Sequence, residues 1–531
     1  MSRRAERTLA ALLLLAGAAP LFAGRFLPFL DMPQHLGLAN ALARYGDPST
    51  GFARYYELDR AVDPYWGYYA LVWVLSHAVP LELASKLVLA AWAISLPLSV
   101  GFALRCLGRD WRWAVFALPL VWHENLFFGF TTFLVSMPLF FVAVGLFARE
   151  LSAERSRRGR AALLGVVAAA VFLSHVQTYL LLGLAAVALA LVEGRGPRLA
   201  LARARAFLPS LALFLAWFLP NFAGAGHPVP LAHTARYRSF GSLGDLGAVF
   251  EPKAETLARA PERIWGMYAD GSGLALGAGY LLLLALSAAL AGWPDSDTAA
   301  EGLVPGREGG FRAALRARRG ELLAVLSLAC YLLLPAQVAG QWYLNARFLI
   351  FAALLAPAFL AARARGGRRL LLAGAAALAL VSDANAARKV AAFQREVEGF
   401  ASLVERMSPG GRALGLVFDR ASAAGIRLPV FVHFASYYQA LRGGDVGFSF
   451  VGLPSIPLRY RAGAQAPHPG EWAPQDFRWE SMGPRYDYFL LRGVPVGDAA
   501  RLAEHAERVG EGGGFTLYRR RDVSRGEASS P

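Results

Sequence analysis

Charged residues and cysteines are both scarce in this chain of 531 residues. Only 17% of the residues are charged, whereas 56% are hydrophobic, and the mean hydropathy is +0.39. The two cysteines, Cys106 and Cys330, lie in or beside apolar segments, so the sequence contains no disulfide framework. The apolar surface exceeds what a soluble fold buries, which indicates a membrane protein.

Several catalytic and nucleotide-binding motifs are also missing. The chain has no Gly-rich phosphate loop of the Walker type, no Cys-x-x-Cys pair and no Gly-x-Ser-x-Gly elbow. These absences argue against ATP-driven transport and serine hydrolysis. The net charge of +16 comes from arginines at the ends of apolar segments, not from a basic stripe interleaved with aromatics. Nucleic acid is therefore not an expected partner.

Long apolar runs are what the sequence does contain. The runs at 81–104, 126–147 and 274–293 are long enough to cross a hydrocarbon core about 30 Å thick as helices. We interpret the first run, 8–23, as an uncleaved anchor because many further spans follow it. We expect about 11 transmembrane helices.

Arginine-rich loops set the expected orientation. The positive-inside rule places such loops in the cytoplasm, and they fall at 3–7, 105–112, 149–160, 195–205, 307–319 and 363–369. Residues 65–79 and 81–104 look like two spans, yet this rule allows one crossing between 65 and 122. Either one of them is re-entrant, or the loop around Arg109 is external.

The C-terminal part has a different composition. We expect a transmembrane domain over 1–385 and a small extracytoplasmic α/β domain over 386–531, which is richer in polar residues, Gly, Pro and Arg. The segments 415–418, 429–434, 486–491 and 515–518 read as strands, and 390–407 and 498–509 as amphipathic helices.

Polar residues gather at the predicted outer ends of separate helices. Ionisable groups near membrane depth usually face a bundle or a water-filled cavity, so we expect a shared external site. Caps of helix ends are the alternative. The set comprises Asp31, His35, His123, Glu124, Asn125, His175, Gln177, Gln341, Asn345 and Arg347, with His227, His233, Arg236 and Tyr237 in a long outer loop.

Asp31 emerges directly after the first apolar span, in Leu-Asp-Met-Pro-Gln-His. A carboxylate there could abstract a proton from a hydroxyl group, or it could cap the helix that begins near Pro33. His35 follows four residues later, on the same helical face. The two side chains could form a hydrogen bond, or hold a divalent cation such as Mg²⁺ or Mn²⁺ together with other ligands.

Arg347 lies at the outer edge of its span, against the positive-inside pattern. A guanidinium there suits the phosphate or diphosphate of a lipid-linked donor, because it pairs bidentately with phosphate oxygens. Snorkelling towards lipid headgroups is the alternative.

The layout resembles the GT-C superfamily, multispan glycosyltransferases that use polyprenyl-phosphate sugar donors at the outer membrane face. The similar features are the first span, the external loop that opens with Asp31, the Pro-Tyr-Trp-Gly-Tyr-Tyr run at 64–69, the many later helices and the C-terminal soluble domain. The resemblance implies that Asp31 is the catalytic base and that Arg347 contacts the donor phosphate. Family members often carry paired acidic residues in this loop. Here Asp31 stands alone, with Asp59 and Asp63 later in the loop.

The sequence thus predicts an inner-membrane glycosyltransferase with an inverting mechanism. It would move a hexose or pentose from a polyprenyl-phosphate donor to a glycan, lipid or protein acceptor at the outer face. His35, His123, Glu124, His175, Gln177, Gln341 and Arg347 are the expected substrate-binding residues. A transporter or flippase of envelope lipids or glycans is the alternative. A scaffold for envelope assembly is a third hypothesis.

Overall fold

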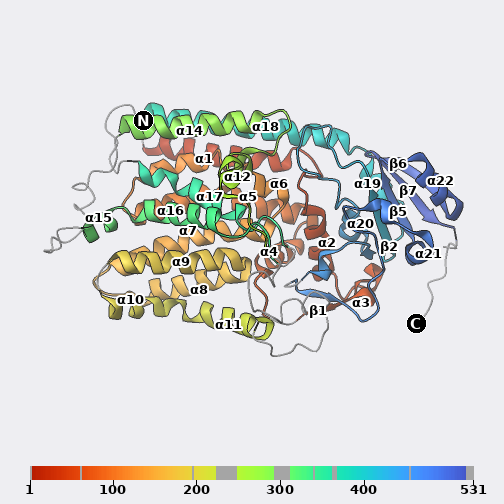
Figure 1. The fold of residues 1–531 in the computed structure, drawn as a ribbon, viewed down its shortest axis with the longest axis horizontal. Helices are drawn as coiled ribbons and strands as arrows, with labels where there is room; N and C mark the ends of the chain where they lie inside the picture. The colour runs from red at the N-terminus through yellow and green to blue at the C-terminus, as the bar shows by residue number, and fades with distance from the viewer. Residues whose placement is uncertain are drawn as a thin grey trace.

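A helical bundle and a small α/β domain lie at opposite ends of the molecule (Figure 1). The structure, a computed structural model, describes residues 3–521 apart from 60–61, 194–195, 223–247, 292–310, 339–340, 361–367 and 454–455. The outer-loop residues His227, His233, Arg236 and Tyr237 therefore lie outside the described residues.

The bundle is built from long apolar helices. Seven helices in the described ranges are long and apolar enough to cross a membrane: Arg4–Phe22, Leu81–Cys106, Thr131–Ser152, Val176–Glu193, Pro197–Leu219, Ser272–Leu290 and Arg369–Glu396. Shorter helices pack beside them, namely α8 (Arg158–Ser174), α16 (Arg319–Leu333) and α17 (Ala346–Leu355). The predicted helical membrane fold is confirmed, while the number of crossings stays a prediction.

The helices of the bundle are α1 (Arg3–Ala18), α5 (Leu81–Cys106), α7 (Thr131–Ser152), α9 (Val176–Glu193), α10 (Pro197–Ala204), α11 (Leu208–Phe222), α14 (Ser272–Ala291), α15 (Phe311–Ala317) and α18 (Arg368–Glu396). Short helices in its connections are α3 (Phe52–Tyr55), α6 (Glu124–Phe128), α12 (Lys253–Ala258) and α13 (Glu262–Trp265).

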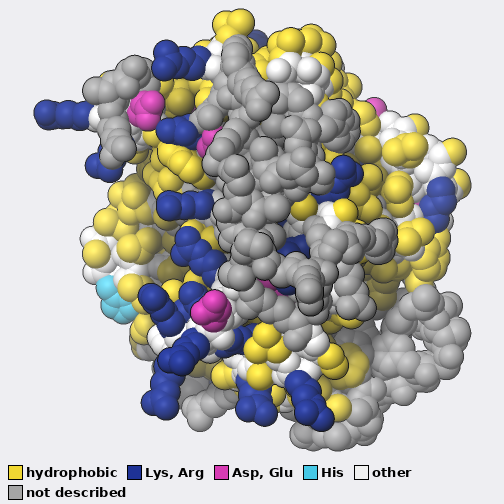
Figure 2. Space-filling model, turned by 90° about the vertical axis from the view of Figure 1, so that its left-hand side faces the viewer, with side chains coloured by type: hydrophobic (Ala, Val, Ile, Leu, Met, Phe, Trp, Pro, Cys, Tyr) yellow, Lys and Arg dark blue, Asp and Glu magenta, His cyan; other side chains and the backbone are white. Residues whose placement is uncertain are grey.

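The end of the bundle remote from the α/β domain carries many arginines, and we call it the arginine end (Figure 2). Several of them pair with buried carboxylates there. Arg203 lies 3.7 Å from Glu150, and Arg319 lies 3.3 Å from Glu193. Arg109 pairs with Glu321 at the start of α16. The loop around Arg109 thus shares the end of the other arginine-rich loops, as the charge rule requires.

The region 65–122 contains one full-length crossing helix. Helix α4 (Trp66–Ser76) has 11 residues, fewer than the roughly 20 that span a bilayer, whereas α5 has 26. The chain then returns towards the α/β domain through the 3-10 helix Trp111–Ala117 and an irregular stretch that contains Pro119. Proline lacks an N–H group, which favours such non-helical backbone.

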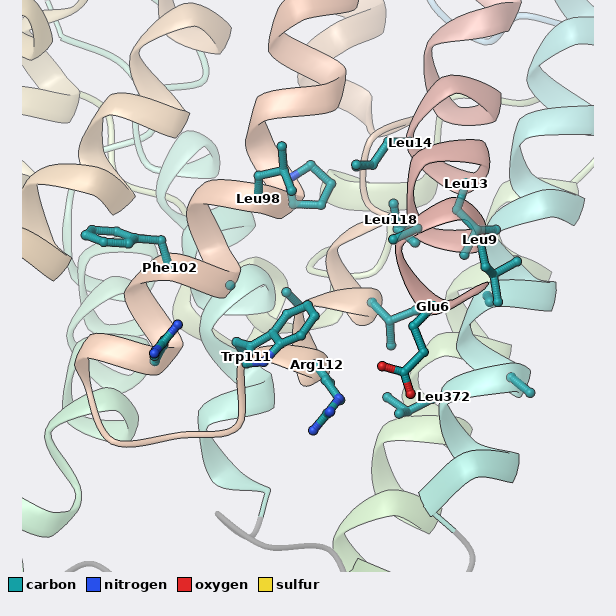
Figure 3. Close-up of a pocket in the computed structure, with 18 of the residues that line it drawn as sticks. Glu6, Leu9, Leu13, Leu14, Leu98, Phe102, Trp111, Arg112, Leu118 and Leu372 are labelled. Atoms are coloured by element: carbon teal, nitrogen blue, oxygen red, sulfur yellow. The ribbon is translucent and has the colours of Figure 1, made fainter. Parts of the chain in front are cut away.

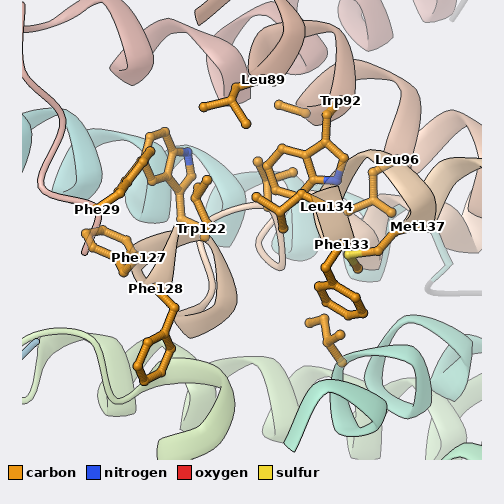
Figure 4. Packing of buried hydrophobic residues seen from close by; sticks show 14 of the residues in the cluster. Phe29, Leu89, Trp92, Leu96, Trp122, Phe127, Phe128, Phe133, Leu134 and Met137 are labelled. Carbon is orange, nitrogen blue, oxygen red and sulfur yellow. The ribbon is translucent and has the colours of Figure 1, made fainter. Parts of the chain in front are cut away.

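Aromatic side chains fill the space around this return segment (Figure 4). Trp122 packs near Phe29 and Phe127, with ring centroids 6.4 Å and 6.1 Å away. Its indole Nε1 donates a hydrogen bond of 3.0 Å to the Gly17 carbonyl of α1. Dense packing therefore holds the irregular backbone beside the first helix.

The α/β domain contains a five-stranded sheet with the order β3-β2-β5-β7-β6. Strand β2 is parallel to β3 and β5, and β7 is antiparallel to β5 and β6. The strands are β2 (Arg412–Val417), β3 (Asp445–Val446), β5 (Tyr488–Arg492), β6 (Ala506–Gly512) and β7 (Phe515–Arg520), and the helices are α19 (Phe400–Glu405), α20 (Ser436–Arg442), α21 (Trp479–Met482) and α22 (Val496–His505).

The predicted strands near 415, 486 and 515 are confirmed, but two other predictions for this part were wrong. Residues 429–434 form consecutive turns instead of a strand, because Phe431 and Phe434 turn inward onto Phe515. The predicted helix 498–509 ends at His505, and the chain continues as β6. The predicted division between the domains falls at residue 385. Helix α18 runs unbroken past this residue to Glu396, so the division stays a prediction.

The first loop of the chain is attached to the α/β domain. Helix α2 (Met32–Ala43) packs against α20, and β1 (Tyr56–Leu58) pairs antiparallel with β4 (Leu458–Tyr460). We call these four elements the clasp. Buried polar bonds cross it: Asn40 Nδ2 donates to the Gln439 carbonyl at 2.9 Å, and the Tyr56 hydroxyl donates to Asp445 at 2.6 Å. The residues around Asp31 are thus fixed by a segment some 400 positions later in the chain.

Replacement of Asp445 by alanine should loosen the clasp. Asp445 is buried and accepts hydrogen bonds from Tyr56, Tyr460 and Arg412. Its removal leaves the Arg412 charge without its carboxylate, which costs about 3 kcal/mol or more. We expect a lower thermal unfolding temperature in detergent. Asp498→Ala, which removes an exposed partner of Arg501, is the control and should leave that temperature unchanged. Equal unfolding temperatures for Asp445→Ala and the wild type would contradict this reading of the clasp.

Candidate functional site

Asp31 lies at the position just before α2, at the end of the bundle that faces the α/β domain. Its backbone N–H donates to the Phe128 carbonyl at 2.9 Å. Close approach to Gly129 is essential here, because a Cβ at Gly129 would come within 3.0 Å of the Asp31 nitrogen. Within the described residues the Asp31 side chain makes no capping hydrogen bond to α2. Its carboxylate instead contacts His433 of the α/β domain at 3.4 Å.

Arg347 is the second residue of α17, and its guanidinium is packed inward. The guanidinium carbon lies 4.0 Å from the centre of the Phe130 ring, and Nη1 lies 3.4 Å from Nε2 of His175. The buried Nε has no hydrogen-bond partner among the described residues. Among the residues that the structure describes, no carboxylate forms an ion pair with Arg347. An inward guanidinium in this state is suited to an anion.

His175, at the junction between α8 and α9, adjoins Arg347, and Gln177 follows two residues later in the first turn of α9. The His175 ring meets Tyr65 and Phe133 edge to face, with centroids 5.2 Å and 5.3 Å away. Gln177 donates through Nε2 to the Leu344 carbonyl. His175 Nδ1 and Gln177 Oε1 are buried without partners among the residues that the structure describes. Such atoms gathered around one arginine are typical of a ligand site.

Asp31 and Arg347 belong to one site. The Asp31 N–H bonds to the Phe128 carbonyl, and the Arg347 guanidinium packs on Phe130, two residues further along the chain, and against His175. Tyr65 in turn contacts His175. A carboxylate, a tyrosine, a histidine and an arginine from four separate segments therefore lie at the end of the bundle that faces the α/β domain.

Other residues from the predicted set have structural partners elsewhere. His35 is buried, and its Nδ1 lies 2.7 Å from the Tyr69 hydroxyl instead of bonding to Asp31. His123 caps α6, since its side chain accepts a hydrogen bond from the Asn125 N–H at 3.1 Å. Glu124, in the same short helix, faces the charges of Arg263 and Arg427. Gln341 forms backbone bonds with Val338. These residues stay predictions as substrate-binding groups.

The arrangement does not fit a cation held by Asp31 and His35. Among the described residues no group of three or more His, Cys, Asp or Glu side chains is placed to hold a metal ion. His35 is directed towards Tyr69. A requirement for Mg²⁺ or Mn²⁺ stays a prediction, and no step below depends on one.

Two of the later carboxylates of the first loop, Asp59 and Asp63, have surroundings of their own. Asp59 pairs with Arg459, a residue of β4. Asp63 is buried, and this burial, together with the charge of Asp59, raises its pKa to about 7. Asp31 is the carboxylate of this loop that contacts His433.

The residues that sequence reasoning missed are His433 and Glu471. Glu471 Oε2 lies 3.3 Å from His433 Nδ1, on the side of the ring opposite Asp31. Both come from the α/β domain. The one weak sign of a functional residue in this part of the sequence was a histidine within the apolar run 429–434.

A large groove of about 740 Å³ lies at the arginine end, far along the bundle from Asp31 (Figure 3). Its walls are apolar side chains of α1, α5 and α18, such as Leu9, Leu98 and Leu372. Its polar groups are Glu6 and arginines, including Arg112. This composition matches a surface covered by lipid chains and provides no acid–base pair for catalysis.

Comparisons with known proteins identify the fold. No model of a known protein family matches the sequence, and no curated protein matches it. The crystal structure of ArnT from Cupriavidus metallidurans bound to undecaprenyl phosphate superposes with a TM-score of 0.57 at 11% identity, covering 98% of both chains. The cryo-EM structure of the arabinofuranosyltransferase AftD from Mycobacteria gives a TM-score of 0.49 at 15% identity, covering 98% of this chain and 40% of AftD.

The similarity to ArnT at such low identity concerns the fold. It extends over nearly the whole chain, from the first helix to the α/β domain. The predicted GT-C-like architecture is therefore confirmed. The chain is a multispan helical membrane protein that has the fold of ArnT over nearly its whole length.

Proposed function

We propose that this protein is a membrane glycosyltransferase that moves a sugar from a polyprenyl-phosphate donor to a hydroxyl group of an envelope acceptor. The observation that carries the proposal is that the Asp31 carboxylate and the inward guanidinium of Arg347 lie beside the same short segment, since the Asp31 N–H bonds to the Phe128 carbonyl and Arg347 packs on Phe130. The first is a proton acceptor and the second an anion-binding group, as this reaction needs. The ArnT structure of the same fold contains undecaprenyl phosphate, which supports a donor of this class.

In the proposed reaction, the acceptor hydroxyl loses its proton to the Asp31 carboxylate and attacks the anomeric carbon of the donor. The bond between this carbon and the phosphate oxygen breaks, and the phosphate leaves with the electron pair. Attack from the face opposite the leaving group inverts the configuration at the carbon. Asp31 then releases the proton to water.

Arg347 stabilises the phosphate as negative charge develops on the leaving oxygen. Because Phe130 and His175 already hold its guanidinium, little ordering is needed when the donor binds. His175 and Gln177 supply further polar atoms next to it. A hexose or a pentose, and a glycan, lipid or protein acceptor, are all compatible with these groups.

The orientation follows from the two unlike ends of the bundle. The arginine end is placed in the cytoplasm by the positive-inside rule. The site and the α/β domain then lie on the extracytoplasmic side of the inner membrane. A transporter or flippase would need polar residues along the bundle, whereas the candidate groups are gathered at one end.

Asp31→Asn should abolish most sugar transfer. Asparagine keeps the size of the side chain but cannot accept the hydroxyl proton, so we expect a fall in rate of about 10²–10⁴-fold. The assay is incorporation of label from polyprenyl-phosphate sugars by membranes with matched amounts of protein. Asp47→Asn, in the exposed part of the same loop, is the control. Equal transfer by Asp31→Asn and the wild type would remove Asp31 as the base, and no wild-type transfer from any donor tested would count against the transferase.

Arg347→Gln should weaken use of the donor. The loss of a charged contact to phosphate costs roughly 1.5–3 kcal/mol, which lowers kcat/KM for the donor by about 10–150-fold. Arg347→Lys keeps the charge without the bidentate geometry and should lie between Gln and wild type. Titration of the labelled donor against a fixed acceptor measures this order. A kcat/KM for Arg347→Gln that equals the wild-type value would exclude a phosphate contact.

Cysteine labelling tests the orientation. Both native cysteines are buried. Ala500→Cys, exposed in α22, should react with a membrane-impermeant maleimide once the outer membrane or cell wall is opened. Gly159→Cys, exposed at the arginine end, should react only after the inner membrane is broken. The reverse order of labelling would place the α/β domain in the cytoplasm.

A further inference from the structure

His433 connects the α/β domain directly to the candidate base. It lies in the turns that precede α20, and its Nε2 is 3.4 Å from Asp31 Oδ1. Its Nδ1 is 3.3 Å from Glu471 Oε2. The side chain is only 5% exposed. A histidine thus stands between two carboxylates that are 440 residues apart in the chain.

The ring is held in a fixed plane by aromatic neighbours. Phe448 stacks on it at 5.5 Å with an angle of 15°, and Phe450 meets it edge to face at 5.4 Å. A cavity of about 30 Å³ adjoins the ring, with Gln34, Ser436 and Glu471 among its lining residues. This volume is enough for one water molecule. The orientation of the ring is therefore set by packing, and its polar edges are left for Asp31 and Glu471.

Two carboxylates at the two ring nitrogens favour one protonation state. A neutral imidazole can donate from one nitrogen only, so one of the two contacts would set a lone pair against a carboxylate. The imidazolium carries an N–H on both nitrogens and places its positive charge 3.4 Å from Asp31 and 3.3 Å from Glu471. Burial opposes this charged form, but the contact with Asp31 and the charge of Glu471 outweigh burial and raise the pKa of His433 above its ordinary value.

The other titratable groups around His433 do not supply a competing positive charge at neutral pH. His35 of α2 faces the same space, and burial lowers its pKa to about 4, so its ring is neutral. His468 lies near Glu471. Burial raises the pKa of Glu471, and the positive charge of His433 partly offsets that effect. His433 is therefore the cation that acts at the shortest distance on Asp31.

A cation in contact with a carboxylate favours its ionised form, and a general base must be ionised to accept a proton. The contact engages Oδ1, so the second oxygen of Asp31 takes no part in it. We propose that His433 is a positioning residue, which holds and orients the Asp31 carboxylate through a charge contact for proton abstraction. This inference rests on the proposed function, because it concerns the same reaction.

The test is the pH dependence of kcat/KM for sugar transfer in wild type and His433→Gln. The acidic limb of this profile reports ionisation of the base in the free enzyme. Loss of the neighbouring cation should move the limb up by about one pH unit or more. Transfer should then be least affected at high pH. A uniform loss at all pH values, or an unchanged limb, would overturn the proposal.

His505→Gln is the matched control. His505 belongs to the same domain but stacks on Trp479, with ring centroids 4.5 Å apart. The same substitution there should leave the acidic limb in place. A limb that moves equally in both variants would mean a general effect on the domain, and would also overturn the proposal.

A second measurement needs no transfer activity, so it separates this inference from the proposed function. A histidine whose pKa is raised by folding stabilises the folded state below its unfolded pKa of about 6.5, and this contribution disappears as pH rises through the folded pKa. The wild type should therefore unfold at a higher temperature than His433→Gln near pH 6, and the difference should shrink in alkaline solution. A difference that does not change with pH would contradict an imidazolium at this position. Absence of wild-type transfer together with the expected stability difference would refute the transferase and leave the charge contact in place.

Discussion

The packing of α2 against α20 is the contact on which the candidate site depends. Asp31 directly precedes α2, and His433 lies just before α20. The two helices are joined by buried polar bonds, including Asn40 to Gln439, which are costly to leave unmade. A shift of one helix along the other would separate the carboxylate from the imidazole. The α/β domain thus helps to build the site, in addition to any contact with an acceptor.

The bundle fixes Asp31 from the opposite side. The irregular return after α5 delivers α6 and Gly129 underneath the start of α2, where the absence of a Cβ lets the two backbones meet. Residues 111–123 form a 3-10 helix followed by irregular backbone at Pro119, instead of a regular α-helix. Non-helical backbone at membrane depth is tolerated where protein surrounds it, and residues 113–130 are almost entirely buried. This non-helical segment thus places Phe128 and Gly129 against the backbone of Asp31.

The sequence predicted the parts of the fold that depend on composition and period. Apolar runs gave the helices, and the positions of arginines gave a common end for the loops, including the one around Arg109. The length of α4 could not be predicted, because Trp66–Ser76 and the residues after it are all apolar enough for a span. The chain turns there at Ser76 and Pro80, short of a crossing. Pro429–Phe434 was misread for a related reason: a short apolar run carries no period that separates a strand from buried turns.

For the site, the sequence pointed to Asp31, His175, Gln177 and Arg347, which the structure gathers at one end of the bundle. It could not point to Glu471 or to the role of His433, because their significance comes from tertiary contacts with a segment more than 400 residues earlier. It also grouped His123 and His35 with the site on their expected depth alone. The cap formed by His123 and the bond of His35 to Tyr69 depend on side-chain directions, which hydropathy does not encode.

The clasp also has a consequence for how the protein is made. Its first half, with Asp31, is synthesised within the first 60 residues, whereas α20, β4 and Glu471 come near the end of the chain. During synthesis α2 and β1 therefore lack their partners α20 and β4 until the intervening helices have been made. A chain stalled before residue 471 would contain all the helices of the bundle but would lack the contacts of His433 with Glu471. The surroundings of Asp31 are therefore completed some 440 positions after Asp31 itself has been synthesised.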